Sequence, residues 1–327
     1  MALSLLFLVI IIALIFEYIN GFHDSANSIA TVVSTKVLTA RSAVIYAGCL
    51  DMVGAFFGTH VAATVGKGII ATGSVTQGVI LCALLSAIIW NLITWYYGIP
   101  SSSSHALIGG LMGAGISKAG YDVVQIEGVF QKVLLPMITS PLLGFIIGFM
   151  CMVLILWLFA KANPGSVNRY FKKLQLVSSG IMALSHGTND AQKTMGIITL
   201  ALVSFHALPT FEVPFWVIFG CALTMGMGTM GGGYRIIRTM GTKMIKLKPV
   251  HGFAAETSAA IVILSASHFG IPVSTTHVIS SSIMGVGSTR GIYAVKWGVV
   301  GNIVKAWVLT IPVTMILAAI LYRILPV

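Results

Sequence analysis

Long apolar stretches, separated by short polar segments, make up most of this 327-residue chain. A helix needs about 20 apolar residues to cross the hydrocarbon core of a bilayer, so each long stretch predicts a membrane-spanning helix. Alternating ten-residue segments, typical of membrane barrel strands, are not visible. We therefore expect an all-α integral membrane protein. Its six full spans are predicted near residues 1–34, 42–65, 133–160, 174–205, 213–234 and 297–322.

Two shorter segments interrupt this pattern and repeat one another. Residues 98–115 read GIPSSSSHALIGGLMGAG and residues 270–287 read GIPVSTTHVISSSIMGVG, at a constant offset of 172 residues. In each copy the Gly-Pro pair predicts the end of an incoming helix. The outgoing helices, near 105–117 and 277–288, would each be under roughly 20 Å long, too short for a bilayer of about 30 Å. Two re-entrant helical hairpins with their tips inside the membrane are the expected result.

Charge is scarce and unevenly placed along the chain. Only 8% of residues are charged and 57% are hydrophobic, which excludes a soluble domain, yet the net charge is +11. Thirteen of the 19 Lys and Arg residues fall in segments 35–41, 161–173, 235–251 and 288–296. Because positive charge marks cytoplasmic loops, this placement predicts a multi-pass protein of the cytoplasmic (plasma) membrane with both termini outside. The basic residues then set the orientation of the chain in the membrane, and nucleic-acid binding is not expected.

The same order of membrane crossings predicts two halves of opposite orientation. Residues 1–160 would form the first membrane repeat, 161–173 a basic cytoplasmic linker, and 174–327 the second, inverted repeat. Inverted repeats with broken segments near the bilayer midplane are typical of secondary transporters, whose substrate site lies at the repeat interface.

The duplicated tips carry runs of hydroxyl groups at the start of a helix. A helix N-terminus offers free N–H groups and the positive end of the dipole, so it favours an anion. The alternative is that these hydroxyls only cap the helices and that the following glycines only serve helix packing. The candidate substrate-binding residues are Ser101, Ser102, Ser103, Ser104, Ser274, Thr275 and Thr276.

A second duplicated element places a carboxylate inside each half. GFHDSANSIAT (21–31) aligns with HGTNDAQKTMG (186–196), which pairs Asp24 with Asp190. An ionisable group in the membrane interior costs about 3 kcal/mol or more and is a functional candidate by default. The glycines at 21 and 187 predict helix breaks that would free backbone carbonyls as further oxygen ligands. The candidate cation-binding residues are Asp24, Asn27, Asn189 and Asp190.

Lys193 stands where the first half has Asn27. Its ammonium group could form an ion pair with Asp190, replace one cation, or contact the anion directly. For Asp51 and Glu256, proton carriage, cation binding and simple packing all stay open, and Glu17 is a weaker candidate. The histidines after the tips could brace the loop or touch substrate. The candidate coupling or supporting residues are Lys193, Gln192, Glu256, Asp51, His105 and His277.

One apparent motif is discounted. Residues 226–231 read GMGTMG, which fits a dinucleotide fingerprint, but the preceding strand and the later acidic residue are missing and position 246 is Lys246. Close helix packing accounts for these glycines. No phosphate-binding loop, zinc-ligand spacing or nucleophile elbow is visible, so neither an enzyme nor an ATP-driven pump is expected, and no cofactor beyond a sodium ion.

Four stretches resemble the signatures of the inorganic phosphate transporter (PiT) family, most closely its short bacterial low-affinity members. These are GFHDSANSIATVVST, WNLITWYYGIPSSSSHALIGG, HGTNDAQKTMGIITLAL and GIPVSTTHVISSSIMGVG. The resemblance implies inverted repeats with two broken helices and two hairpins, in a protein that is often a homodimer. It also implies phosphate at Ser102–Ser104 and Ser274–Thr276, and cations near the two aspartates. His23 and Lys193 depart from the family pattern, which has asparagine at both places.

The expected function is symport of phosphate with a proton or sodium ion by alternating access in a lipid bilayer. A sulfate permease of the same fold is the nearest alternative, because hydroxyls and N–H groups suit any tetrahedral oxyanion. An anion channel is a third, since channels also use re-entrant hairpins. Buried carboxylates in both halves favour ion coupling over a channel.

Overall fold

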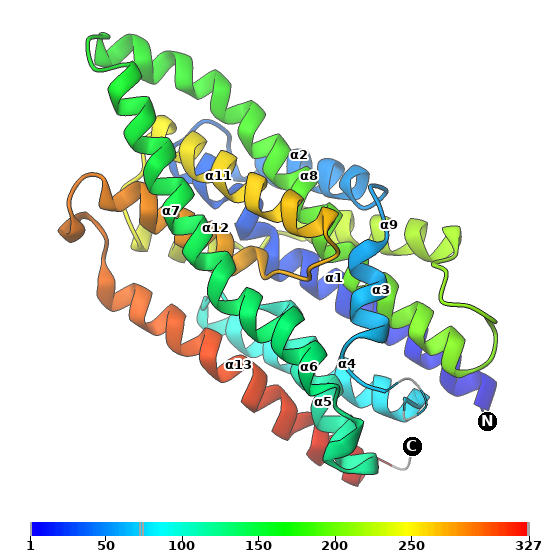
Figure 1. The fold of residues 1–327 in the computed structure, drawn as a ribbon. Helices are drawn as coiled ribbons and strands as arrows, with labels where there is room; N and C mark the ends of the chain where they lie inside the picture. The colour runs from blue at the N-terminus through cyan, green and yellow to red at the C-terminus, as the bar shows by residue number, and fades with distance from the viewer. Residues whose placement is uncertain (1, 72, 74, 326–327) are drawn as a thin grey trace.

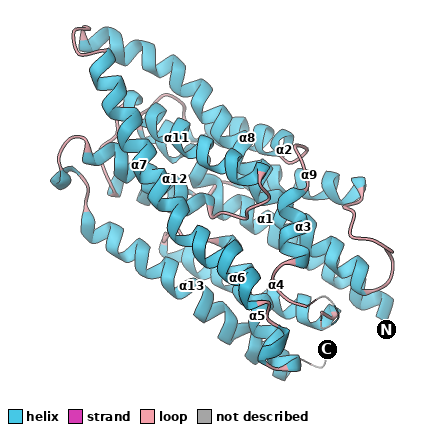
Figure 2. Ribbon diagram, in the orientation of Figure 1, coloured by secondary structure: helices cyan, strands magenta, loops and turns pink. Residues whose placement is uncertain are grey.

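The computed structural model describes residues 2–71, 73 and 75–325, and helices make up nearly all of them (Figures 1 and 2). Within these ranges there is no strand, only an isolated bridge between Ile70 and Val124. The first half contains α1 (Ala2–Ser34), α2 (Ala40–Gly54), α3 (His60–Lys67), α4 (Gln77–Tyr97), α5 (Ser103–Ala119), α6 (Ile126–Val129) and α7 (Leu135–Leu158). The second contains α8 (Pro164–Ser204), α9 (Phe215–Gly231), α10 (Tyr234–Arg238), α11 (Pro249–His268), α12 (Thr275–Ser288) and α13 (Trp297–Ile324). A long helix, a broken pair, a hairpin and a final long helix therefore occur twice, in the same order.

Several helices are long and apolar enough to cross a membrane, which confirms the predicted class of integral membrane protein. The predicted spans near 1–34, 133–160 and 297–322 are confirmed as long apolar helices. The span near 213–234 is α9, which continues into α10 through a bend of 58°. The incoming hairpin helices α4 and α11 are also of membrane length.

The predicted continuous span near 42–65 is wrong. The chain leaves helical geometry after Gly54 and resumes it at His60, so α2 and α3 are separate helices. Gly58 lies in the connection between them with φ of +101°, a conformation that favours glycine. The span near 174–205 is one helix, α8, but polar residues fill its middle and it does not reach the apolarity of a typical span.

The predicted helix breaks at Gly21 and Gly187 are also wrong, because α1 and α8 run through both positions without interruption. These glycines instead permit close helix packing. A Cβ atom at Gly21 would lie 2.5 Å from the carbonyl oxygen of Met225 on α9, and one at Gly187 would lie 2.1 Å from that of Asp51 on α2. The breaks in this fold lie instead between α2 and α3 and between α9 and α10.

The two halves interlock through their hairpins. The outgoing helix α5 packs along α13, the last helix of the second half, and α12 packs along α7, the last helix of the first half. Glycines bring these pairs together: a Cβ atom at Gly113 would lie 1.9 Å from the Met315 carbonyl oxygen, and one at Gly285 would lie 2.1 Å from that of Phe145. The packing interpretation of the glycines after the tips is therefore confirmed. The opposite orientation of the halves in a membrane stays a prediction.

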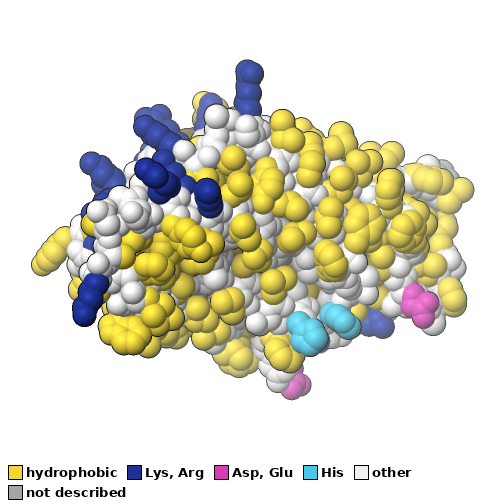
Figure 3. Space-filling model, turned by 90° about the horizontal axis from the view of Figure 1, so that it is seen from above, with side chains coloured by type: hydrophobic (Ala, Val, Ile, Leu, Met, Phe, Trp, Pro, Cys, Tyr) yellow, Lys and Arg dark blue, Asp and Glu magenta, His cyan; other side chains and the backbone are white. Residues whose placement is uncertain are grey.

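Charge is polarised along the molecule. Apolar side chains cover much of the face shown in Figure 3, and most of the Lys and Arg side chains on it lie toward one end. The loops between α7 and α8 and between α12 and α13 lie at this end, opposite both termini (Figure 1). The predicted grouping of basic segments is thus seen in space, whereas their cytoplasmic location stays a prediction. Five of the eight acidic residues are buried: Glu17, Asp24, Asp51, Asp190 and Glu256.

Candidate functional site

Each hairpin turns through the same backbone conformation. Gly98 ends α4 with φ of +65° and Gly270 follows α11 with φ of +68°, so both adopt the left-handed conformation that ends a helix. Pro100 and Pro272 then prevent the incoming helices from resuming. The two short segments that follow form the tips, here defined as residues 100–104 and 272–276.

The outgoing helices begin two residues earlier than predicted because each has a serine cap. The Ser102 hydroxyl accepts a hydrogen bond from the backbone N–H of His105 at 3.2 Å, and the Ser274 hydroxyl accepts one from that of His277 at 3.3 Å. The capping interpretation therefore holds for these two hydroxyls. The hydroxyls that follow each cap are left to face the centre of the molecule.

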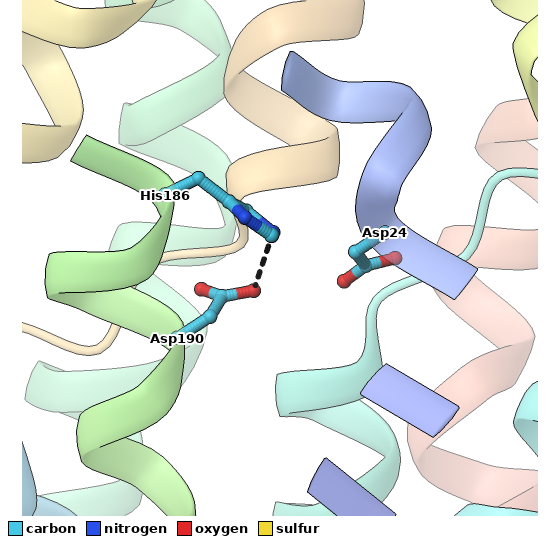
Figure 4. Close-up of side chains that lie close together, drawn as sticks. All are labelled: Asp24, His186 and Asp190. Carbon is cyan, nitrogen blue, oxygen red and sulfur yellow. Dashed lines mark ion pairs between the residues drawn. The ribbon is translucent and has the colours of Figure 1, made fainter. Parts of the chain in front are cut away.

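Two aspartates face each other at this centre. Figure 4 shows Asp24 on α1 opposite Asp190 and His186 on α8, and one ligand atom from each of the three lies within 4.8 Å of the others. Asp24 is 3% exposed and Asp190 is fully buried. The structure thus brings together the two carboxylates that the repeat predicted.

One hydrogen bond is the same in both halves. The Ser103 hydroxyl donates to Asp24 Oδ2 at 3.1 Å, and the Thr275 hydroxyl donates to Asp190 Oδ2 at 3.1 Å. These hydroxyls occupy equivalent positions in the two tips. Each tip is therefore joined to the aspartate of its own half.

A second pair of hydrogen bonds joins each long helix to the tip of the other half. Lys193 Nζ on α8 donates to the Ser104 hydroxyl at 2.5 Å. Asn27 Nδ2 on α1 donates to Thr276 Oγ1 at 2.9 Å and to Thr275 Oγ1 at 3.1 Å. The predicted tip and cation residues thus form one continuous polar centre.

The remaining oxygen of each aspartate is contacted differently. Asp24 Oδ1 lies 2.5 Å from His23 Nδ1, whereas Asp190 Oδ1 accepts a hydrogen bond from Lys193 Nζ at 2.5 Å. His23 Nε2 lies 3.1 Å from Thr94 Oγ1, to which the Ser101 hydroxyl donates at 2.9 Å. Ser101 therefore contacts α4, the incoming helix of its own hairpin.

Among the described residues, Asn189 forms no hydrogen bond to a tip hydroxyl or to either aspartate. Its Nδ2 donates to the Ser267 hydroxyl on α11 at 2.8 Å. Within the described residues its buried Oδ1 has no hydrogen-bond partner, so this oxygen is available as a ligand.

His186 is a component of the centre that the sequence motifs did not predict. Its Nδ1 lies 3.1 Å from Asp51 Oδ1 and its Nε2 lies 3.4 Å from Asp190 Oδ2, so it connects α2 to the centre. Asp51 Oδ2 also accepts a hydrogen bond from Thr229 on α9 at 2.6 Å. The spacing of four residues between His186 and Asp190, which places both on one helix face, was the available signal.

Two candidate supporting residues act at a distance from the aspartates. Gln192 Oε1 accepts a hydrogen bond from the Val61 N–H at 2.8 Å and so caps the start of α3, whose own N-cap residue supplies no side-chain bond. Glu256 lies in a separate buried cluster. Its carboxylate accepts hydrogen bonds from Thr31, Gln175 and Ser178.

The two histidines that follow the tips pack against each other. Their rings, from His105 and His277, lie 4.9 Å apart, and His277 stacks on Trp307 at 4.0 Å. Trp307 Nε1 in turn donates to the carbonyl of Pro100 in the first tip at 3.2 Å. These contacts are those expected of residues that brace the tips.

The centre is enclosed on all sides. The hydroxyl residues of both tips are at most 4% exposed. Carboxylate, hydroxyl and amide oxygens are ligands for hard cations. Hydroxyls at two helix N-termini, placed together, suit an oxyanion. The side chains of the centre thus include ligand groups for both a cation and an oxyanion.

Comparisons with known proteins agree with this chemistry. Residues 20–318 match the phosphate transporter family. The chain is 48% identical to a "Probable low-affinity inorganic phosphate transporter" of Rhizobium meliloti (strain 1021), over 98% of the chain and 97% of the relative. It is 47% identical to the protein of the same name from Bacillus subtilis (strain 168), over 99% and 98%.

A solved structure named "The sodium-dependent phosphate transporter" superposes with a TM-score of 0.91 at 28% identity, over 98% of each chain. Both the sequence relatives and this structure extend over nearly the whole molecule, including the tips and both aspartates. The names given to the family and its members indicate a transporter and not an enzyme. With the family match covering most of its length, this chain belongs to the phosphate transporter family.

Proposed function

We propose that this protein imports inorganic phosphate by symport with a monovalent cation, through alternating access. The observation that carries the proposal is the junction of both tips and both aspartates in one buried centre. Phosphate would bind between the hydroxyls of Ser103, Ser104, Thr275 and Thr276. The cation would bind at the carboxylates and offset the charge of the anion.

Phosphate is favoured over sulfate by the position of the carboxylates. At neutral pH phosphate keeps a proton to donate, whereas sulfate has none. Asp24 and Asp190 lie within hydrogen-bond distance of the tip hydroxyls and can accept that proton's hydrogen bond. Against sulfate the same carboxylates would face only negative charge, which costs several kcal/mol at short range.

Alternating access is supported by the enclosure of the centre and by the packing of the hairpins. With all tip hydroxyls buried, neither end of the molecule reaches the centre. Because each outgoing hairpin helix packs closely on the last helix of the other half, the two bundles that would move against each other to open one end at a time each contain helices from both repeats, 1–160 and 174–327.

A sodium ion or a proton can serve as the cation. The similar solved structure is named as a sodium-dependent transporter, which supports sodium, and the oxygen ligands of the centre suit that ion. The location in the cytoplasmic membrane with both termini outside and the homodimeric state stay predictions.

Uptake of labelled phosphate into proteoliposomes tests the proposal. A sodium gradient and a pH gradient are imposed separately, and equimolar sulfate is added as competitor. Accumulation above equilibrium under at least one gradient, with little competition, is expected. Full competition by sulfate would contradict phosphate specificity, and passive flux under both gradients would indicate a channel.

A further inference from the structure

The ammonium group of Lys193 is surrounded by oxygen atoms of the protein, as a bound metal cation would be. Among the described residues it is the one Lys or Arg whose side chain is buried, at 2% exposure. Its Nζ donates to three oxygens: Asp190 Oδ1 at 2.5 Å, Ser104 Oγ at 2.5 Å and the carbonyl of Val273 at 3.0 Å. One oxygen comes from α8 and one from each tip.

By the alignment of the repeats, the equivalent positions of the first half also carry oxygen atoms, but no ammonium group. Asp24 is equivalent to Asp190, Thr276 to Ser104, and Ser101 to Val273. At the position equivalent to Lys193 stands Asn27, whose amide is neutral and donates to the tip hydroxyls. Among the described residues Asp24 therefore forms no ion pair with a Lys or Arg, and its Oδ1 contacts His23 and, at 3.5 Å, Thr276.

Two other roles for Lys193 fit less well. An ammonium group has three donors, and all three are used by protein oxygens, so none is left for the anion. A simple ion pair would explain the contact with Asp190. It would not explain two further ligands, one from each of two hairpins that are far apart in the sequence.

We propose that the Lys193 ammonium is a tethered cation that permanently fills the cation position of the second half. A single mobile cation, bound beside Asp24, then accompanies each phosphate. Asp190 and Lys193 cancel in charge, and Asp24, which has no ammonium or guanidinium group in contact among the described residues, keeps the one charge that the mobile cation must balance. This inference rests on the proposed symport function.

The test compares cation stoichiometry in Lys193→Asn with that in wild type. Purified protein is reconstituted, and the phosphate gradient that just stops uptake is measured against a known sodium gradient, or a pH gradient if that drives wild-type uptake. We expect one cation per phosphate in wild type and two in Lys193→Asn, because the vacated oxygens must now be filled from solution. The half-saturating cation concentration should rise roughly tenfold or more, since a tethered group acts at a high effective concentration.

Two further variants make the result decisive. Asp190→Asn/Lys193→Met removes both charges together and should be slower but keep one cation per phosphate. Lys305→Asn, which removes an exposed lysine of α13, should behave as wild type. Thermal melting and size-exclusion elution confirm that each variant is folded.

The outcomes separate the two proposals. A wild-type stoichiometry in Lys193→Asn, with only a higher half-saturating phosphate concentration, would show an anion ligand and overturn the inference. So would a folded double variant that transports nothing, because Asp190 would then be needed for a mobile cation. Uncoupled flux in wild type would instead overturn symport, and the inference with it.

Discussion

In the first half of the centre Asp24 lies between His23 and Ser103, whereas in the second half Asp190 lies between Lys193 and Thr275. The hydrogen bond from the tip hydroxyl is the same in both halves. The basic residue beside the carboxylate differs, because it is a histidine in the first half and a lysine in the second. Under the proposed function, the shared contacts would hold the tetrahedral anion, and the group that differs beside each carboxylate would set the number of accompanying ions.

The largest expected effects come from neutralising the two aspartates. Asp24→Asn and Asp190→Asn should each abolish gradient-driven uptake, measured in proteoliposomes, without preventing membrane insertion. Their stabilities should differ. Asp190→Asn leaves the buried Lys193 ammonium without its carboxylate and should lower the free energy of unfolding by about 3–5 kcal/mol. Asp24→Asn removes a carboxylate that has no Lys or Arg partner.

Melting temperatures in detergent measure this difference, with Lys305→Asn as the matched control. Equal melting temperatures for the two aspartate variants would remove the distinction drawn between the halves. Normal accumulation by Asp24→Asn would remove Asp24 from the cation site, and normal accumulation by Asp190→Asn would show that the Lys193 ammonium needs no carboxylate beside it.

Steric substitutions at the equivalent glycines give the next largest effect. Gly187→Ala would place a methyl group 2.1 Å from the Asp51 carbonyl oxygen, and Gly21→Ala would place one 2.5 Å from that of Met225. Overpacking of this kind costs about 1–3 kcal/mol, so both variants should be less stable, Gly187→Ala the more so. Gly298→Ala, at a position with open space, is the control. Thermal melting decides the order, and an unchanged Gly187→Ala would contradict the close packing of α8 on α2.

The two helix caps should respond equally. Ser102→Ala and Ser274→Ala each remove one hydrogen bond to a backbone N–H and should cost about 0.5–2 kcal/mol of stability. Each cap variant should lower the melting temperature to a similar extent. A large difference between them would show that the tips are less alike than their hydrogen bonds suggest.

Removing the central hydroxyls should have a small but measurable effect on anion binding. Ser103→Ala and Thr275→Val each delete one net hydrogen bond, worth about 0.5–1.5 kcal/mol, and should raise the half-saturating phosphate concentration about two- to tenfold. Thr275→Val should be the more severe, because Thr275 also accepts a hydrogen bond from Asn27. Uptake kinetics measure both. An unchanged half-saturating concentration in Ser103→Ala would count against that hydroxyl as a ligand.

The sequence predicted the parts of the centre but not how they join. The duplicated phrases located both tips and both aspartates, because the same residue types recur at a constant spacing. The contacts of Lys193 with Ser104 and of Asn27 with Thr276 cross between halves, and no local pattern encodes which half a side chain reaches. The prediction of helix breaks at Gly21 and Gly187 was wrong for a related reason. A glycine permits either a kink in its own helix or the close approach of a second helix, and the sequence around it does not show which of the two occurs.

The exchange of hairpin partners has a consequence for how the protein is made. The first outgoing helix, α5, is fully packed only when it contacts α13. Because α13 begins at Trp297, it is synthesised long after Ala119, the last residue of α5. The hydroxyls and backbone groups of the first tip therefore stay partly exposed until nearly the whole chain has been inserted. Contacts so distant in sequence are expected to form late and together. The transport centre and the final fold should then appear in the same step of biogenesis, with no competent half-assembled state before it.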